Sequence, residues 1–588
     1  MSRALSGLGV SPGIAIGEPV VHETRPISTL RITIPPEKVD AEIERFRQAV
    51  TATVKHIQEN RDRAAKQMGE EYAAIFEAHQ LMAADPSFTG PVEKVIHDQE
   101  VNAGWAIDQV LEKLISKFEA LPDDYLADRK ADVLDVATQI LHALHGYHLG
   151  QLEQLDRPVI LVADDLPPSA AVQLPLDKML GFALEMGGPT SHTTIIARSL
   201  GIPVIVGAQG SCDEAKRSRR IAIDAFEGKI VFDPNPAELS EYQSRQREYK
   251  EQQAALLQMR HVPTVTRDGR SIQLLANIDL PNEIDHAMDW NVSGVGLYRS
   301  EFLYMKMSPA LPNEKDHIEV YREMVSKMAP NPVTIRTFDL GGRKLAREII
   351  GDGSEANPVL GLRGIRLCFS KPDFFRAQLR ALLLTAGEFP VGRLKIMFPL
   401  ISGIEEVRVA RLLVREISSE LRDEGHEIPE GIPLGAMVEV PSSAIMAREL
   451  AREIDFISIG TNDLIQYSLA VDRSNNLVAD LYSPTHPAVL RLIAEVIAAG
   501  EAENTDVSMC GEMAADPLMV PVLVGLGLRS FSMNPQAVPV VRSLIRQLSF
   551  REAGQIARQA AKFVTARDVE EYLLERLAFL LAKTKIQV

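Results

Sequence analysis

A chain of 588 residues is too long for one ordinary domain, since domains commonly hold roughly 100–200 residues. Its 63 Lys and Arg residues against 80 Asp and Glu residues give a net charge of −17, which argues against nucleic acid or an anionic membrane as the main partner. The hydrophobic fraction of 46% and charged fraction of 24% are those of globular proteins and exclude a disordered, collagen-like or coiled-coil rod.

Cysteine usage and the N-terminus point to a reducing compartment. Cys212, Cys368 and Cys510 lie far apart with no CxxC spacing, which excludes a disulfide framework and a thiolate zinc site. The first residues lack the apolar core of a signal peptide, and no run of about 18 apolar residues occurs. We therefore expect a cytoplasmic protein without membrane insertion.

Changes in residue pattern divide the N-terminal 261 residues. Residues 1–35 contain short apolar runs broken by Gly and Pro, which indicates strands, whereas residues 36–149 repeat apolar residues at helical spacing. The strand pattern returns over residues 150–235, so we expect these to complete the sheet that the first segment begins. Residues 236–261 are polar-rich and predict a linker helix.

From residue 262 to 588 short apolar runs alternate with helix-length spacers. The eight runs are SIQLLANID, GVGLYRSE, VTIRTFD, RLKIMFPL, IPLGAMVE, FISIGTND, DVSMCGE and RSFSMNP. Eight such units predict a (β/α)₈ barrel. The fold class that we expect is therefore multidomain α/β, with a helical insert in an α/β domain and a C-terminal barrel.

Polar side chains stand where several predicted barrel strands end, the rim on which such barrels place their chemistry. They are Arg299, Arg336, Glu439, Asn462, Asp463 and Cys510. Two guanidinium groups, of Arg299 and Arg336, suit a phosphate, and the two carboxylates suit Mg²⁺. Asn462 and Arg473 are candidate further ligands for a carboxylate or phosphate. For Cys510 we keep both readings, a proton donor and inert buried packing.

The segment GGPTSHTTIIARSLGIPVIVG, residues 187–207, places His192 at a predicted helix start. The unpaired N–H groups and the helix dipole there disfavour imidazolium and stabilise an anion attached to the ring. A lone histidine is more often structural, but this setting predicts a phosphohistidine.

These motifs resemble the enzyme I family of the bacterial phosphotransferase system, one of the phosphoenolpyruvate (PEP)-utilising enzymes. The likeness runs from SPGIAIG near the start to the barrel, through GGPTSHTTIIARSLGIPVIVG, GVGLYRSEFL, IRTFDLGG, NPVLGLRGIR, MVEVPS, FISIGTNDLIQYSLAVDR and MCGEMA. It implies a swivelling phosphohistidine domain interrupted by a helical domain, then a linker and a PEP-binding (β/α)₈ barrel.

The resemblance also implies roles for single residues. His192 is phosphorylated, Cys510 protonates the enolate carbon to give pyruvate, and Glu439 with Asp463 binds Mg²⁺. The residues implied to bind PEP are Arg299, Arg336, Asn462, Asp463 and Arg473, and Arg363 matches a position near the active site.

The partners that the resemblance implies are the carrier HPr and a second copy of the chain. HPr docks on the helical insert, where Glu70, Glu71 and Glu77 suit a basic partner, although such a charge run is usually a solvated face. Dimerisation takes place through the barrel. The overall reaction is transfer of a phosphoryl group from PEP through His192 to a histidine of HPr, the first step of sugar uptake.

Two positions depart from the family pattern. Pro189 replaces an arginine common in the family, and Arg343 stands where an acidic residue is common. Neither change removes a predicted ligand, so we expect activity to survive.

Four alternatives remain to be weighed. A dikinase or synthase charged by ATP would need a nucleotide-binding domain, and no P-loop is present. An inactive regulatory protein is disfavoured because every predicted ligand is kept, and a barrel lyase or aldolase would leave His192 without a role. A nitrogen-regulatory phosphotransferase is the closest alternative, and we prefer the sugar branch because no sensory domain precedes residue 1.

Overall fold

The computed structural model describes residues 3–22, 30–68, 70–119, 124–145, 157–186, 202–281, 283–307, 311–341, 357–473, 475 and 477–584. The chain divides into two compact units, residues 1–251 and 252–588. Among the described residues, no helix combines the length and the apolar character needed to cross a membrane.

The first unit contains an eight-stranded mixed sheet built from two separate segments of the chain. Its order is β1-β8-β7-β3-β4-β5-β6-β2. The strands are β1 Arg3–Ser6, β2 Leu8–Ser11, β3 Ile14–His22, β4 Val159–Ala163, β5 Met179–Leu184, β6 Val204–Val206, β7 Ile221–Asp224 and β8 Lys229–Phe232. Since β3 pairs with β4 in parallel and with β7 in antiparallel fashion, the late segment completes the sheet that the early one begins, as predicted.

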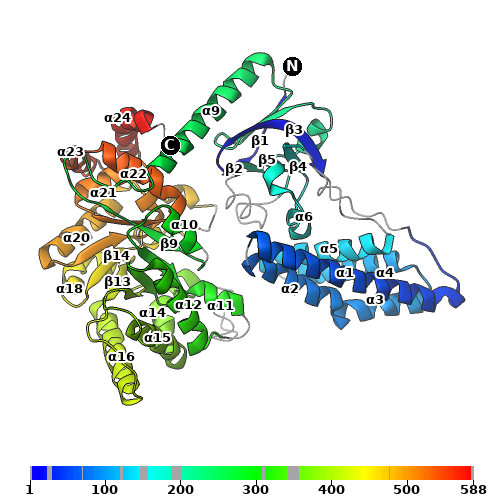
Figure 1. Cartoon of the computed structure of the whole chain (residues 1–588), viewed down its shortest axis with the longest axis horizontal. Coiled ribbons are helices and arrows are strands. Elements are labelled where there is room, and N and C mark those ends of the chain that lie inside the picture. Colours follow the sequence, from blue (N-terminus) through cyan, green and yellow to red (C-terminus); the bar gives the residue numbers. More distant parts are fainter. Residues whose placement is uncertain are drawn as a thin grey trace. The chain divides into compact units, whose positions relative to one another are not determined.

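Between β3 and β4 the described chain is mainly helical, which confirms the predicted helical insert. The helices are α1 Val39–Met68, α2 Glu70–Ala84, α3 Pro86–Gln99, α4 Ala103–Glu119 and α5 Asp124–His145, and they lie side by side as the blue bundle of Figure 1. Apolar residues at helical spacing, such as Phe46, Ile57, Ile96 and Ile140, form their common core. Local signals set the ends: the Asp85 carboxylate accepts the Ser87 N–H at 2.7 Å and caps α3.

Short helices α6 (Pro168–Ala171) and α8 (Ser211–Ala215) accompany the sheet, and α9 (Pro236–Gln258) follows it. Tyr242 of α9 is buried with Ile14 of the sheet. Beyond the end of α9, the chain is fixed to the second unit by Arg542, which is 2% exposed. Its guanidinium donates to the carbonyl oxygens of Met259 at 3.0 Å and Arg260 at 2.6 Å.

The second unit is a closed barrel of parallel strands, in the order β10-β11-β12-β13-β14-β15-β16-β9. The strands are β9 Gln273–Ile278, β10 Val295–Arg299, β11 Val333–Arg336, β12 Leu394–Phe398, β13 Leu434–Val438, β14 Phe456–Ile459, β15 Asp506–Met509 and β16 Ser530–Met533. Each of the eight predicted runs contains one of them, so the (β/α)₈ prediction is confirmed.

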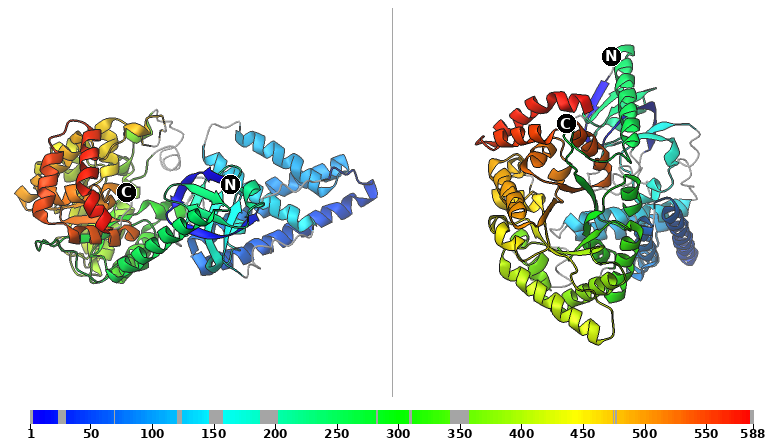
Figure 2. Two further views of the ribbon diagram at one scale, coloured as in Figure 1. Left: turned by 90° about the horizontal axis from the view of Figure 1, so that it is seen from above. Right: turned by 60° about the vertical axis from the view of Figure 1, so that its left-hand side comes forward.

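The barrel strands are surrounded by helices, which Figure 2 shows in green through red. The helices are α10 Glu283–Asp289, α11 Glu301–Met307, α12 Glu314–Met328, α14 Gly364–Ser370, α15 Pro372–Gly387, α16 Ile404–Asp423, α17 Pro441–Ile445, α18 Ala447–Ala451, α19 Thr461–Leu469, α20 Pro487–Glu503, α21 Val520–Leu526, α22 Val538–Gln547, α23 Phe550–Ala560 and α24 Ala566–Thr584. Apolar residues of the strands and the helices form one continuous core. This core fixes the strand ends that carry the polar side chains.

Candidate active site on the barrel rim

The carboxyl ends of the parallel strands bring the predicted rim residues to one end of the barrel. Arg299 and Arg336 are the last residues of β10 and β11, Glu439 directly follows β13, and Cys510 directly follows β15. Asn462 and Asp463 lie in the first turn of α19, three and four residues after β14 ends. The sequence therefore places all six at the same rim.

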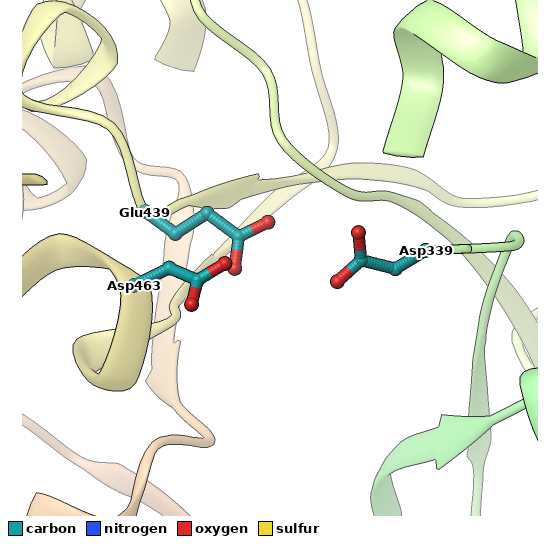
Figure 3. A group of neighbouring side chains, drawn as sticks. All are labelled: Asp339, Glu439 and Asp463. Atoms are coloured by element: carbon teal, nitrogen blue, oxygen red, sulfur yellow. The ribbon is translucent and has the colours of Figure 1, made fainter. Parts of the chain in front are cut away.

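Three carboxylates meet at this rim. One oxygen each from Asp339, Glu439 and Asp463 lies within 4.8 Å of the other two, and Figure 3 shows the Asp339 carboxylate facing the other two across a gap. Glu439 and Asp463 are only 3% and 6% exposed. Such crowding of buried negative charge is costly without positive charge nearby.

Two arginines supply part of that positive charge. The Nη2 group of Arg363 donates to Asp339 Oδ2 at 2.9 Å and lies 2.8 Å from Asp463 Oδ2. Arg336 is 8% exposed, and its Nη1 group lies 3.1 Å from Asp339 Oδ2. Asp339 therefore holds both guanidinium groups beside the other two carboxylates.

Arg336 retains a donor for a ligand. Its Nε atom is buried and has no hydrogen-bond partner among the described residues. A buried unpaired N–H group is destabilising unless a ligand or water accepts from it. The positive charge of the guanidinium favours an anion at the rim.

Glu439 is fixed by its local backbone. Its Oε1 atom accepts the Leu400 N–H at 2.6 Å, and a Cβ added to Gly460 would lie 2.8 Å from Oε2. The absence of a side chain at Gly460 thus leaves the space in which the Glu439 carboxyl group lies. Burial, followed by the charges of Asp339 and Asp463, raises the pKa of Glu439 to about 8 against the opposing effect of Arg336 and Arg363.

The group fits Mg²⁺. Carboxylate oxygens are the ligands that this cation prefers, and the three carboxylates are close enough to share one ion. Burial first, and then the two neighbouring carboxylates, disfavour ionised Glu439, a cost that a bound cation would offset. Glu439 and Asp463 were predicted as ligands from the sequence.

Glu439 makes the stability of the metal-free protein depend on pH. A carboxyl group whose pKa is raised in the folded state binds its proton more tightly there than in the unfolded chain, so stability falls as pH rises from about 4.5 to about 8. Mg²⁺ binds the ionised group. We expect Mg²⁺ to raise the melting temperature of the barrel more at about pH 8.5 than at about pH 6.5. An equal gain at both values would contradict this reading.

Cys510 lies inside the barrel mouth, 3% exposed, in a cluster with Leu297, Met397, Met437 and Phe456. Burial raises the pKa of its thiol, and the charge of Glu439 adds to the effect. The thiol therefore keeps its proton at neutral pH, as a proton donor must.

The remaining predicted ligands lie at the rim but are engaged with other partners. Arg299 Nη1 donates to Asp279 at 3.0 Å. Asn462 Nδ2 donates to Glu512 Oε1 at 3.0 Å, and Arg473 Nη1 lies 3.9 Å from the same oxygen. The ligand roles of Arg299, Asn462 and Arg473 stay predictions.

Several predicted features fall outside the described residues. His192, its predicted helix start and Pro189 lie within residues 187–201, and Arg343 lies within residues 342–356. The side chains of Glu70 and Glu71 are also outside the description. Glu77, half exposed, pairs with Arg61 on α1, which fits a solvated face as well as a docking face.

Sequence reasoning missed Asp339 and Glu301. Asp339 stands three residues past Arg336 in IRTFDLGG, and Glu301 follows the end of β10 in YRSE. Glu301 Oε1 accepts from Arg336 Nη2 at 3.2 Å and from the Asp339 N–H. The position just past a barrel strand was a usable signal for both, but the resemblance drew attention to the family's named ligands.

Three family models of PEP-utilising enzymes match the chain. The family model for the PEP-binding domain of PEP-utilising enzymes matches residues 253–550, that for their N-terminal domain matches residues 6–129, and that for their mobile domain matches residues 155–228.

Proteins called phosphoenolpyruvate-protein phosphotransferase are similar over nearly the whole chain. Those of Bacillus sp. (strain S) and Geobacillus stearothermophilus are each 39% identical over 571 residues, which is 97% of this chain and 98% of the relative. That of Staphylococcus carnosus (strain TM300) is 38% identical over 98% of this chain and 99% of the relative. The chain therefore belongs to the PEP-utilising enzyme family, in its phosphoenolpyruvate-protein phosphotransferase branch.

Proposed function

We propose that this chain transfers the phosphoryl group of PEP to His192 and then to a histidine of an HPr-type carrier, releasing pyruvate as the first step of sugar uptake. The observation that carries the proposal is the rim itself, where three carboxylates converge with the buried Arg336 and the partly buried Arg363. The names of the relatives favour this reaction over the nitrogen-regulatory alternative.

Phosphoryl transfer requires little covalent help and much charge neutralisation. Glu439 and Asp463 would hold Mg²⁺, which when bound supplies positive charge against phosphoryl and carboxylate oxygens. The positively charged guanidinium of Arg336 binds the anionic substrate. Arg299, Asn462 and Arg473 complete the contacts to PEP from the outer rim.

Pyruvate is formed from PEP in two steps. The neutral imidazole of His192 forms a bond to phosphorus as the bond from phosphorus to the enol oxygen breaks, which leaves the enolate of pyruvate. The Cys510 thiol then gives its proton to the enolate carbon, and solvent returns a proton to sulfur. Burial keeps the thiol protonated until that step.

The remaining parts of the chain carry the phosphoryl group from the barrel to the carrier. We assign residues 1–35 and 150–235 to the phosphohistidine domain, 36–149 to the insert that docks the carrier, 236–261 to the hinge, and 262–588 to the barrel, which also dimerises. Arg542 supports a hinge that ends near residue 259, because its hydrogen bonds fix the chain there. The three buried free cysteines fit a reducing compartment such as the cytoplasm.

Pyruvate release tests this function. We expect the full chain to convert PEP to pyruvate, followed through lactate dehydrogenase and NADH, only with Mg²⁺ present. Without a carrier the yield should stop at about one pyruvate per chain, and an excess of an HPr-type carrier should increase it. A chelator should stop the reaction and added Mg²⁺ restore it. Pyruvate formation that persists in the chelator, or that continues beyond this single turnover without a carrier, would contradict the proposal.

A further inference from the structure

The backbone between Arg336 and Asp339 leaves the barrel sheet and is then fixed by side chains. β11 ends at Arg336, and the Thr337 N–H still donates to Met397 O on the neighbouring strand at 2.9 Å. Beyond this point side chains of other elements replace the sheet hydrogen bonds. These hydrogen bonds hold the segment in place and so set the positions of the Arg336 and Asp339 side chains at its two ends.

Ser300 and Gln378 supply two of these hydrogen bonds, and both are 0% exposed. The Ser300 hydroxyl donates to Arg336 O at 2.8 Å. The Gln378 side chain, on α15, accepts the Phe338 N–H at 3.1 Å and donates to the Ser300 hydroxyl at 2.9 Å. The side-chain amide of Gln378 therefore links the two hydrogen bonds that hold the segment, one to the Phe338 N–H and one from Ser300 to Arg336 O.

The amide can face only one way. The Phe338 N–H requires the oxygen of Gln378, so its NH₂ group points to the hydroxyls. Its second hydrogen reaches the Tyr321 hydroxyl on α12 at 3.0 Å, which in turn lies 3.0 Å from His317 Nδ1. The chain of hydrogen bonds thus runs from α12 through α15 to the strand end.

We propose that Ser300 and Gln378 are positioning residues for the reaction, which set Arg336 and Asp339 at the geometry that binds PEP. The inference rests on the proposed function. Neither side chain touches the carboxylate group itself. Each acts on the backbone of the segment, and the buried network resists displacement because a broken hydrogen bond would leave a polar group unsatisfied.

Ser300→Ala and Tyr321→Phe form a matched pair of variants. Each removes one buried hydroxyl that accepts from Gln378, so each should lower the melting temperature of the barrel to a similar extent. Only Ser300→Ala also releases the carbonyl of Arg336.

We expect Ser300→Ala to raise KM for PEP about 10-fold and to lower kcat/KM more, while Tyr321→Phe changes KM less than about twofold. Gln378→Met loses the hydrogen bonds to Phe338, Ser300 and Tyr321 and should resemble Ser300→Ala in KM. The double variant Ser300→Ala with Gln378→Met should lose less than the sum of the two. Gln378→Met also keeps the test decisive if Ser300→Ala fails to fold.

The inference is overturned if Ser300→Ala and Gln378→Met keep the wild-type KM, or if Tyr321→Phe raises KM as much as they do. Failure of the proposed function looks different, because the wild-type protein itself would then release no pyruvate from PEP.

Discussion

His192→Ala is expected to abolish phosphoryl transfer from PEP to the carrier while leaving the affinity for PEP within about twofold of wild type. The proposal gives this chain one group that forms a bond to phosphorus, the His192 imidazole, whereas the proposed substrate ligands all lie on the barrel. Carrier phosphorylation and calorimetric titration with PEP and Mg²⁺ measure the two properties separately.

A matched control is available outside the helical insert, after α16. His426→Ala removes a histidine whose side chain is 49% exposed and lies 3.9 Å from Glu424, and it should leave both properties unchanged. If His192→Ala still phosphorylated the carrier, another residue would be the phosphoryl acceptor.

The second large effect is expected for Glu439→Gln. The change removes one metal-binding charge, while the amide oxygen still accepts the Leu400 N–H and the packing against Gly460 is kept. We expect kcat to fall about 10²–10³-fold, the size seen when one charge-stabilising group is lost from a preorganised site. Initial rates across a range of Mg²⁺ concentrations measure it.

The melting temperature distinguishes this loss of kcat from misfolding of the variant. Ionised Glu439 destabilises the metal-free protein because burial and two carboxylates raise its pKa, so the neutral variant should melt at a higher temperature than wild type near pH 8. The rise in melting temperature on adding Mg²⁺ should also no longer depend on pH in this variant. A variant that melts lower than wild type and is inactive would instead indicate a damaged fold.

Hydrophobic periodicity and strand-end rules sufficed for the architecture. All eight barrel strands were predicted, because each is a short apolar run that ends in polar residues, and the helical insert was predicted because its apolar spacing changes from strand to helix. The pairing of β3 with β4 joins residues on either side of the whole insert. It was predictable only because two incomplete strand segments need a common core.

Contacts between residues that are far apart in the sequence could not be predicted from it. Glu439 and Asp463 were predicted as partners, but nothing local shows that Arg363 reaches both Asp339 and Asp463. Similarly, Asn462 and Arg473 sit in a recognised motif, yet their pairing with Glu512 depends on how two loops pack. Such contacts depend on tertiary packing, which residue periodicity does not encode.

Labelling with ³²P tests the central claim most directly. The purified protein is incubated with Mg²⁺ and either ³²P-labelled PEP or γ-³²P-ATP, for wild type and His192→Ala, and the stability of the label in acid and base is measured. The account predicts an acid-labile, base-stable label from PEP alone, absent in His192→Ala and passed on to added HPr. Label from ATP, or no label from either donor, would contradict it.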